Sequence, residues 1–266
     1  MRTFNNQIVN LLTESGIDIE IFSNDELLST QGRMVAYLIN AGVISYDQYV
    51  EMYEGFRGRN PYIETFEMAP RSFGETWLEN RILGQFPSYN PPQVTRGFLK
   101  AKKRIVNQYL PDYRDPLNKV FGSQFDFLCF DGDEKYKVEV KACRANSEEP
   151  LDRFGTSSLT SRAYSYEEAR NAGFKFHFQQ IKPGFCDVFI LVGVCTDAIL
   201  YWILTSEELR NEGGLSPQHP TSGITDIDDE RYEGQVYKRV EDYENYLVSE
   251  NDILNAILNK FNGGEE

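Results

Sequence analysis

The chain has 266 residues, and its 27 Lys and Arg residues against 41 Asp and Glu residues give a formal net charge of -14 at pH 7. Hydrophobic residues make up 41% of the sequence, which is enough for a folded core and excludes a disordered or collagen-like chain. The two histidines, His177 and His219, are too few for a histidine-rich metal cluster or for a nuclease site built from several imidazoles.

Several further classes of protein are excluded by missing motifs. The cysteines have no C-x-x-C spacing, so we expect neither a zinc site nor a disulfide framework. Neither G-x-x-x-x-G-K-[ST] nor G-x-G-x-x-G occurs, so we expect no nucleotide cofactor. The longest apolar run, Val188 to Cys195, is far shorter than the roughly 20 residues that cross a bilayer, and no apolar leader opens the chain. We therefore expect a cytoplasmic protein without a membrane segment.

The N-terminal part of the chain is predicted to be helical. Residues 1–69 form a helical N-terminal lobe in this interpretation, with one helix from Arg33 to Asn40 that ends at Gly42 and another that begins after Ser45. A further helix is expected between Ser72 and Leu83, before a proline-rich stretch.

A basic segment follows. The pattern of apolar residues predicts a helix from Arg96 to Leu110, and the cations Lys100, Lys102, Lys103 and Arg104 are crowded on it. A charge run of this kind is often only a solvated helix face. In a chain of net charge -14, however, a concentrated positive segment is a candidate for contacting the phosphates of DNA.

The hydrophobic period then changes from 3.6 to 2, which predicts strands. Phe125 to Phe130 and Tyr136 to Val140 flank Asp131-Gly132-Asp133-Glu134, a strong hairpin signal. Two more strands are expected from Asp187 to Val194 and from Ala198 to Leu204. Residues 213–240 are interpreted as an acidic, loop-rich region, and Ser249-x-x-Asp252 predicts the cap of a last amphipathic helix.

The predicted hairpin places charged residues close together. If Gly132 and Asp133 form a two-residue turn, paired residues have numbers that sum to 265, so Asp126 lies opposite Glu139 with Cβ atoms about 5 Å apart. Two like charges placed this way need compensation, and a divalent cation that prefers carboxylate oxygens would provide it. Lys141 lies two residues beyond Glu139 and therefore on the same face. The alternative interpretation is a salt-bridge cluster on an exposed sheet face.

These residues resemble the PD-(D/E)XK nuclease superfamily, and specifically a type II restriction endonuclease. The resemblance rests on Gly122-Ser123-Gln124-Phe125-Asp126-Phe127-Leu128, on Lys137-Val138-Glu139-Val140-Lys141-Ala142, and on the later segments 176–182 and 186–191. It covers about residues 70 to 205. It implies an α/β fold, in which a restriction-endonuclease-like central mixed sheet is flanked by helices within a nuclease core of residues 70–266.

The resemblance also implies roles for single residues. Asp126 and Glu139 would bind Mg²⁺, Lys141 would orient or activate the attacking water, and a further glutamate would come from a preceding helix. Glu75 is the best match for that glutamate, with Glu79 one helical turn further on, although either could be an ordinary exposed acid. The sequence departs from the family motif at Phe125, which stands where the name-giving proline is expected.

The implied function is a Mg²⁺-dependent, sequence-specific endonuclease that cuts double-stranded DNA as a homodimer. The alternatives are a structure-directed or modification-directed nuclease of the same fold, or a catalytically inactive DNA-binding relative. Arg144 and Arg162 are additional DNA-binding candidates, and base recognition is plausible but unassigned in the loops 146–162 and 216–219. Gln179 and Gln180 could supplement the site, but the more ordinary interpretation is that they satisfy a strand end.

Overall fold

The computed structural model of the protein describes residues 38–39, 42–45, 74–79, 81–82, 96–114, 124–146, 165–195, 197–211, 214–218 and 224–262. The proposed N-terminal lobe therefore lies largely outside the described residues, as does the helix expected after Ser45. The described part of the lobe shows the helix end that the sequence predicts at Gly42. Gly42 has a φ of 73°, and Val43 N–H donates to Leu38 O at 2.9 Å, as in a Schellman motif.

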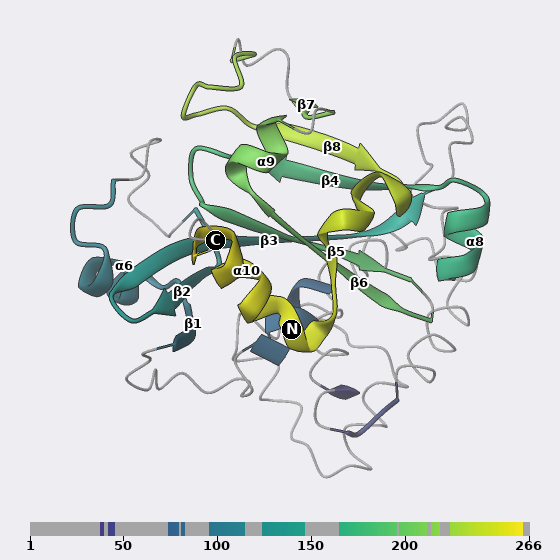
Figure 1. The fold of residues 1–266 in the computed structure, drawn as a ribbon, viewed down its shortest axis with the longest axis horizontal. Helices are drawn as coiled ribbons and strands as arrows, with labels where there is room; N and C mark the ends of the chain where they lie inside the picture. The colour runs from purple at the N-terminus through teal and green to yellow at the C-terminus, as the bar shows by residue number, and fades with distance from the viewer. Residues whose placement is uncertain are drawn as a thin grey trace, which may run out of the picture.

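The centre of the molecule is a nine-stranded mixed sheet (Figure 1). Its main path runs in the order β7 (Ser216–Pro217), β8 (Gly234–Lys238), β4 (Lys175–Ile181), β3 (Glu134–Asn146), β5 (Val188–Val194), β6 (Ile199–Thr205) and β9 (Leu247–Val248). Two strands lie off this path, because β1 (Arg96–Lys100) pairs with β2 (Phe127–Asp131), which in turn pairs with β3. Strands β3 and β5 are parallel, whereas the other pairs are antiparallel.

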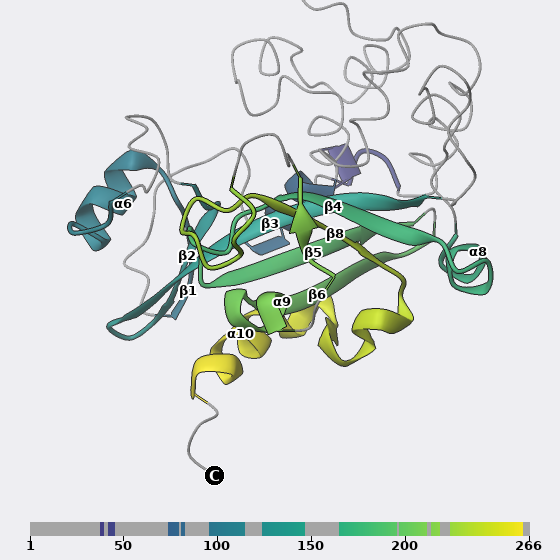
Figure 2. The same ribbon diagram turned by 90° about the horizontal axis from the view of Figure 1, so that it is seen from above.

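Helices flank the sheet on both sides (Figure 2). They are α6 (Lys103–Tyr109), α8 (Tyr166–Asn171), α9 (Ser206–Asn211), α10 (Ile253–Asn262), the 3-10 helices η2 (Glu241–Tyr246) and η3 (Glu250–Asp252), and the helical residues 74–79 and 81–82. The predicted α/β class with a mixed sheet and flanking helices is therefore confirmed. Among the described residues, no helix has the length and apolar character needed to cross a membrane.

The core lies on both faces of the sheet because alternate side chains of each strand point in opposite directions. On one face, Val138 and Val140 pack in a cluster with Trp77, Leu78 and the apolar side of α10. On the other face, Phe189 and Leu191 belong to a cluster that includes apolar residues of α6 and α9. Strand β5 lies between β3 and β6, and every one of its residues is buried. This explains its continuous apolar sequence.

The predicted hairpin is confirmed, including its register. Phe127 pairs with Val138 and Asp131 with Glu134, so the paired numbers sum to 265 as expected. Gly132 has a φ of 61°, a backbone conformation that suits glycine at the first turn position. Strand β3 continues to Asn146, well beyond the predicted end at Val140.

Two predictions of secondary structure were wrong in part. Residues 96–100 form strand β1 rather than the first third of a helix, and only Lys103–Tyr109 is helical. The short apolar run Phe98-Leu99 is compatible with the period of a helix and with that of a strand. It forms a strand because it pairs with β2, which is distant in the sequence. The supposed loop region 213–240 contains β7 and β8. At the C-terminus, Ser249 precedes η3, and α10 begins only at Ile253.

Candidate active site

The site lies along one edge of β3, where the strand changes partners. This edge pairs with β2 up to Val138 and with β4 only from Ala145 onward, while β5 holds the opposite edge from Val138 to Arg144. Among the described strands, none pairs with residues 139–144 on the β2 and β4 side. Within the described part of the chain, this edge of β3 therefore has no strand partner between its pairings with β2 and β4.

Asp126 lies at one end of this open edge, immediately before β2. Its N–H donates to Val138 O at 2.9 Å, and its carboxylate Oδ2 accepts a hydrogen bond from Val140 N–H at 2.8 Å. Its carbonyl oxygen accepts a third hydrogen bond, from Ala101 N–H, at 2.8 Å. These bonds to backbone groups fix the position of the carboxylate beside β3.

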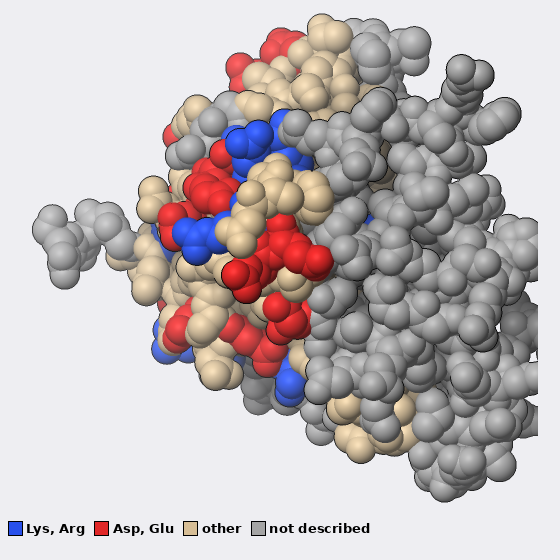
Figure 3. Space-filling view, turned by 90° about the vertical axis from the view of Figure 1, so that its right-hand side faces the viewer, with Lys and Arg blue, Asp and Glu red and all other residues tan. Residues whose placement is uncertain are grey.

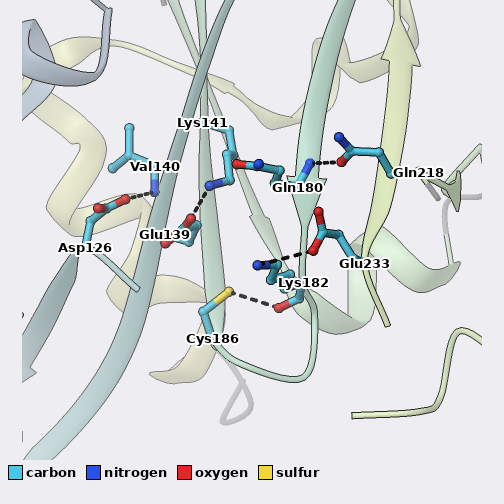
Figure 4. A network of polar contacts seen from close by, with 9 residues as sticks. All are labelled: Asp126, Glu139, Val140, Lys141, Gln180, Lys182, Cys186, Gln218 and Glu233. Atoms are coloured by element: carbon cyan, nitrogen blue, oxygen red, sulfur yellow. Dashed lines mark hydrogen bonds and ion pairs between the residues drawn. The ribbon is translucent and has the colours of Figure 1, made fainter. Parts of the chain in front are cut away.

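Glu139 and Lys141 come from β3 itself. They lie on the same face because they are two residues apart, and Val140 between them points into the core. The Lys141 ammonium and Glu139 Oε1 form a hydrogen-bonded ion pair (Figure 4). Only 12% of the Lys141 side chain and 14% of the Glu139 side chain are exposed, so little solvent screens this pair.

The electrostatics of the site reflect this crowding of charge. Burial, followed by the charge of Asp126, raises the pKa of the Glu139 carboxyl to about 8, although Lys141 opposes the shift. Burial alone would lower the pKa of Lys141, but the carboxylates of Glu139 and Asp126 outweigh it and raise that pKa above its ordinary value. Lys141 is therefore a cation at neutral pH, suited to orient a water or stabilise negative charge rather than to accept a proton.

The structure separates the two candidate glutamates. Glu75 belongs to the helical residues 74–79, and its charge raises the pKa of both Glu139 and Lys141, which places it beside the site. A Cβ on Gly74 would lie 2.8 Å from the Ala142 Cβ, so the absence of a side chain lets this helix approach β3 closely. Glu79 instead forms an ion pair with Lys100.

The donor set suits one hard divalent cation. The contacts described above engage Asp126 Oδ2 and Glu139 Oε1, and each carboxylate retains its other oxygen as a candidate ligand atom. The described residues contain no cluster of three or more His, Cys, Asp or Glu side chains around one point. Two carboxylates with water and phosphate oxygens are a usual environment for Mg²⁺. Burial and Asp126 disfavour the ionised form of Glu139, and a bound cation would stabilise that form.

The basic candidates lie in different surroundings. Lys102, Lys103 and Arg104 are exposed at the start of α6. Lys100 is on β1 rather than on the helix, where it pairs with Glu79 and lies over the Phe127 ring at 5.4 Å. Arg144 is only 9% exposed, so it does not present an open DNA-contacting surface, and Arg162 lies outside the described residues.

Sequence reasoning missed how β4 is shaped beside the site. Gln180 adopts a φ of 58°, which is uncommon for a residue other than glycine, at a bulge between Gln179 and Ile181. Its N–H donates to Gln218 Oε1 at 2.5 Å, while Lys182 pairs with Glu233 at 3.3 Å. Figure 4 shows these residues across from Glu139 and Lys141. The bulge has no signal in the sequence, since neither Gln179 nor Gln180 is a typical turn residue.

A buried thiol also borders the site. Burial, and then the charge of Glu139, hold the pKa of Cys186 well above its ordinary value. Its Sγ–H donates weakly to Lys182 O at 3.8 Å. A protonated, buried thiol is a poor nucleophile, so Cys186 contributes packing rather than chemistry.

The chain was compared with protein-family models, curated proteins and solved structures. No family model, no curated protein and no solved structure matches the chain.

Proposed function

We propose that the protein is a Mg²⁺-dependent, sequence-specific endonuclease that hydrolyses phosphodiester bonds of double-stranded DNA, as a type II restriction enzyme does. One observation carries this proposal. The carboxyl groups of Asp126, just before β2, and of Glu139, on β3, meet the Lys141 ammonium beside β3, and Asp126 raises the pKa of Glu139 when no cation is bound.

Each residue has a distinct part in the proposed reaction. Bound Mg²⁺ would supply an activated water and would neutralise charge on the phosphate and on the leaving oxygen. Asp126 and Glu139 would hold it, with Glu75 adding negative charge nearby. Lys141 keeps its proton, so it would orient the water and offset the negative charge that develops on the phosphate.

The charge distribution favours a duplex at this end of the molecule. Ala101 N–H donates to the carbonyl oxygen of Asp126, which ties this part of the chain to the candidate site. The exposed cations Lys102, Lys103 and Arg104 follow Ala101 directly in the sequence. Acidic side chains gather at the opposite end, over α8 and η2 (Figures 1 and 3). The exposed acids there are Glu167, Glu168, Asp197, Glu241, Asp242 and Glu244. They would repel DNA and direct it toward α6.

A homodimer is part of the proposal. Each chain offers one such site, and cutting both strands of a palindrome needs two sites related by the symmetry of the DNA. The dimer would therefore place one open edge of β3 at each scissile phosphate.

The test is incubation of the purified protein with unmethylated plasmid and phage DNA in Mg²⁺, followed by gel electrophoresis. Discrete fragments are expected from wild type and none from Lys141→Ala. Lys135→Ala is the matched control, because Lys135 lies on the same hairpin but donates only to Asp133 O, at an exposed position. A smear would indicate a non-specific nuclease, and intact DNA would favour a binding protein. Wild-type cutting in excess chelator would refute the metal site.

A further inference from the structure

The outer face of β4 and β8 differs from the rest of the molecule. The inward-pointing residues Phe176, Phe178 and Val236 are buried in the core. The alternate residues point outward, and Tyr237 among them is 45% exposed. The outward residues of the pair are His177, Gln179, Gln235 and Tyr237. We call this set the polar face.

The polar face carries no negative charge of its own. Although 41 of the 266 residues are Asp or Glu, none of them lies within β4, β7 or β8. The nearest acid before β8, Glu233, is paired with Lys182. Lys175 opens β4 and Arg239 follows β8, but this end of the two strands adjoins α8 and η2 with their exposed acids, and Asp242 Oδ2 accepts a hydrogen bond from Arg239 N–H. The end that carries Gln179 and Gln235 lies away from those acids and offers DNA uncharged hydrogen-bonding groups.

The amides on this face form an ordered row. Gln179 is paired directly with Gln235, which is paired in turn with Ser216 on β7. Opposed side chains of this kind have Cβ atoms about 5 Å apart. An amide oxygen only accepts, so His177 Nε2–H donates to Gln235 Oε1 at 3.0 Å and holds that side chain in place. The part of the chain that the structure describes offers the carboxamide of Gln179 no hydrogen-bond partner.

The polar face is also linked to the candidate active site. Gln179 directly precedes Gln180, the residue at the bulge that Gln218 holds through a hydrogen bond. Beyond the bulge, β4 leads to Lys182, across the open edge from Glu139 and Lys141 (Figure 4). A duplex bound at the open edge would therefore pass next to the end of the polar face that carries Gln179.

We propose that the polar face lies against the major groove and that Gln179 selects an adenine in the recognition sequence. This inference rests on the proposed function. The side chain of Gln179 projects from the sheet face, and a glutamine carboxamide matches the N6 donor and N7 acceptor that adenine presents in the major groove. Gln235, restrained by His177, lies opposite Gln179 on the facing strand. Arginine, the usual reader of guanine, is missing from the described strands β4, β7 and β8.

The experiment first defines the recognition sequence from the fragments that wild type cuts. Each adenine in that sequence is then replaced by 7-deazaadenine, which pairs normally but lacks the N7 acceptor, and binding of the full-length protein is measured in Ca²⁺. For one adenine per half-site, the replacement should weaken wild-type binding by about 10-fold to 100-fold. Gln179→Ala should bind both duplexes alike, and its affinity for an unrelated duplex should equal that of wild type.

Two further variants sharpen the test. Gln108→Ala removes an exposed glutamine from α6 and should stay as sensitive to the replacement as wild type. Gln179→Glu keeps the shape but only accepts hydrogen bonds, so it should prefer cytosine at the same position. If Gln179→Ala keeps the full sensitivity, or if the recognition sequence has no A·T pair, the inference is wrong and the proposed function stands. If wild type produces no discrete fragments, the proposed function is wrong, and the assignment of Gln179 to base recognition is wrong with it.

Discussion

Glu139 should make the metal-free protein less stable as the pH rises. Burial and the charge of Asp126 raise its pKa from 4.5 to about 8, so between these values the carboxyl is protonated in the folded chain and ionised in the unfolded chain. The folded state then binds more protons than the unfolded state. The stabilising contribution of Glu139 is therefore complete below about pH 4.5 and is lost as the pH rises to about 8. The slope approaches about 1.4 kcal/mol per pH unit. Between about pH 5.5 and about pH 7.5 the loss should be roughly 2 to 3 kcal/mol.

Glu139→Gln isolates this contribution, because the variant keeps every other titrating group but cannot ionise at this position. The assay is urea denaturation in chelator, followed by tryptophan fluorescence, since Trp77 and Trp202 are 8% and 1% exposed. The stability of wild type relative to the variant should fall across the pH range. Adding Ca²⁺ at about pH 7.5 should then stabilise wild type by about 2.7 kcal/mol at 100 times its Kd, but not the variant. Parallel pH profiles for the two proteins would refute the proposed electrostatic coupling at Glu139.

Three other variants test separate parts of the structure. Lys141→Ala should lower the cleavage rate at least roughly 100-fold while DNA binding in Ca²⁺ changes little, and a variant that keeps more than about a tenth of the rate would remove Lys141 from the mechanism. Replacing Lys102 and Lys103 by Ala should reduce the slope of log K against log salt by about 0.9 for each phosphate that the protein no longer neutralises, whereas an unchanged slope would assign these cations to solvent. Gly193→Ala places a Cβ 2.8 Å from ring atoms of Trp202, so it should cost about 1 to 3 kcal/mol in urea denaturation. Unchanged stability would show that the ring can move.

The sequence alone determined the register of the hairpin that carries the candidate site. The dipeptide Gly132-Asp133 fixes a two-residue turn, and in a two-residue hairpin the turn fixes the register of every following pair. The period of two then places Glu139 and Lys141 on one face. The pairing of residues 127–131 with residues 134–138 could therefore be predicted by counting, because the interactions that specify it are close together along the chain. Asp126 lies just outside this ladder, since its N–H donates to Val138 O and its carboxylate accepts from Val140 N–H.

The tertiary structure decided what surrounds that hairpin. Residues 96–100 form a strand only because β2 pairs with them, and this pairing places Lys100 against Glu79 instead of on a DNA-binding helix. The length of β3 and the position of its open edge depend on where β4 and β5 join it. The bulge at Gln180 depends on Gln218, which is 38 residues away. Local periodicity cannot specify these features, because each one results from pairing or packing between segments that are far apart in the sequence.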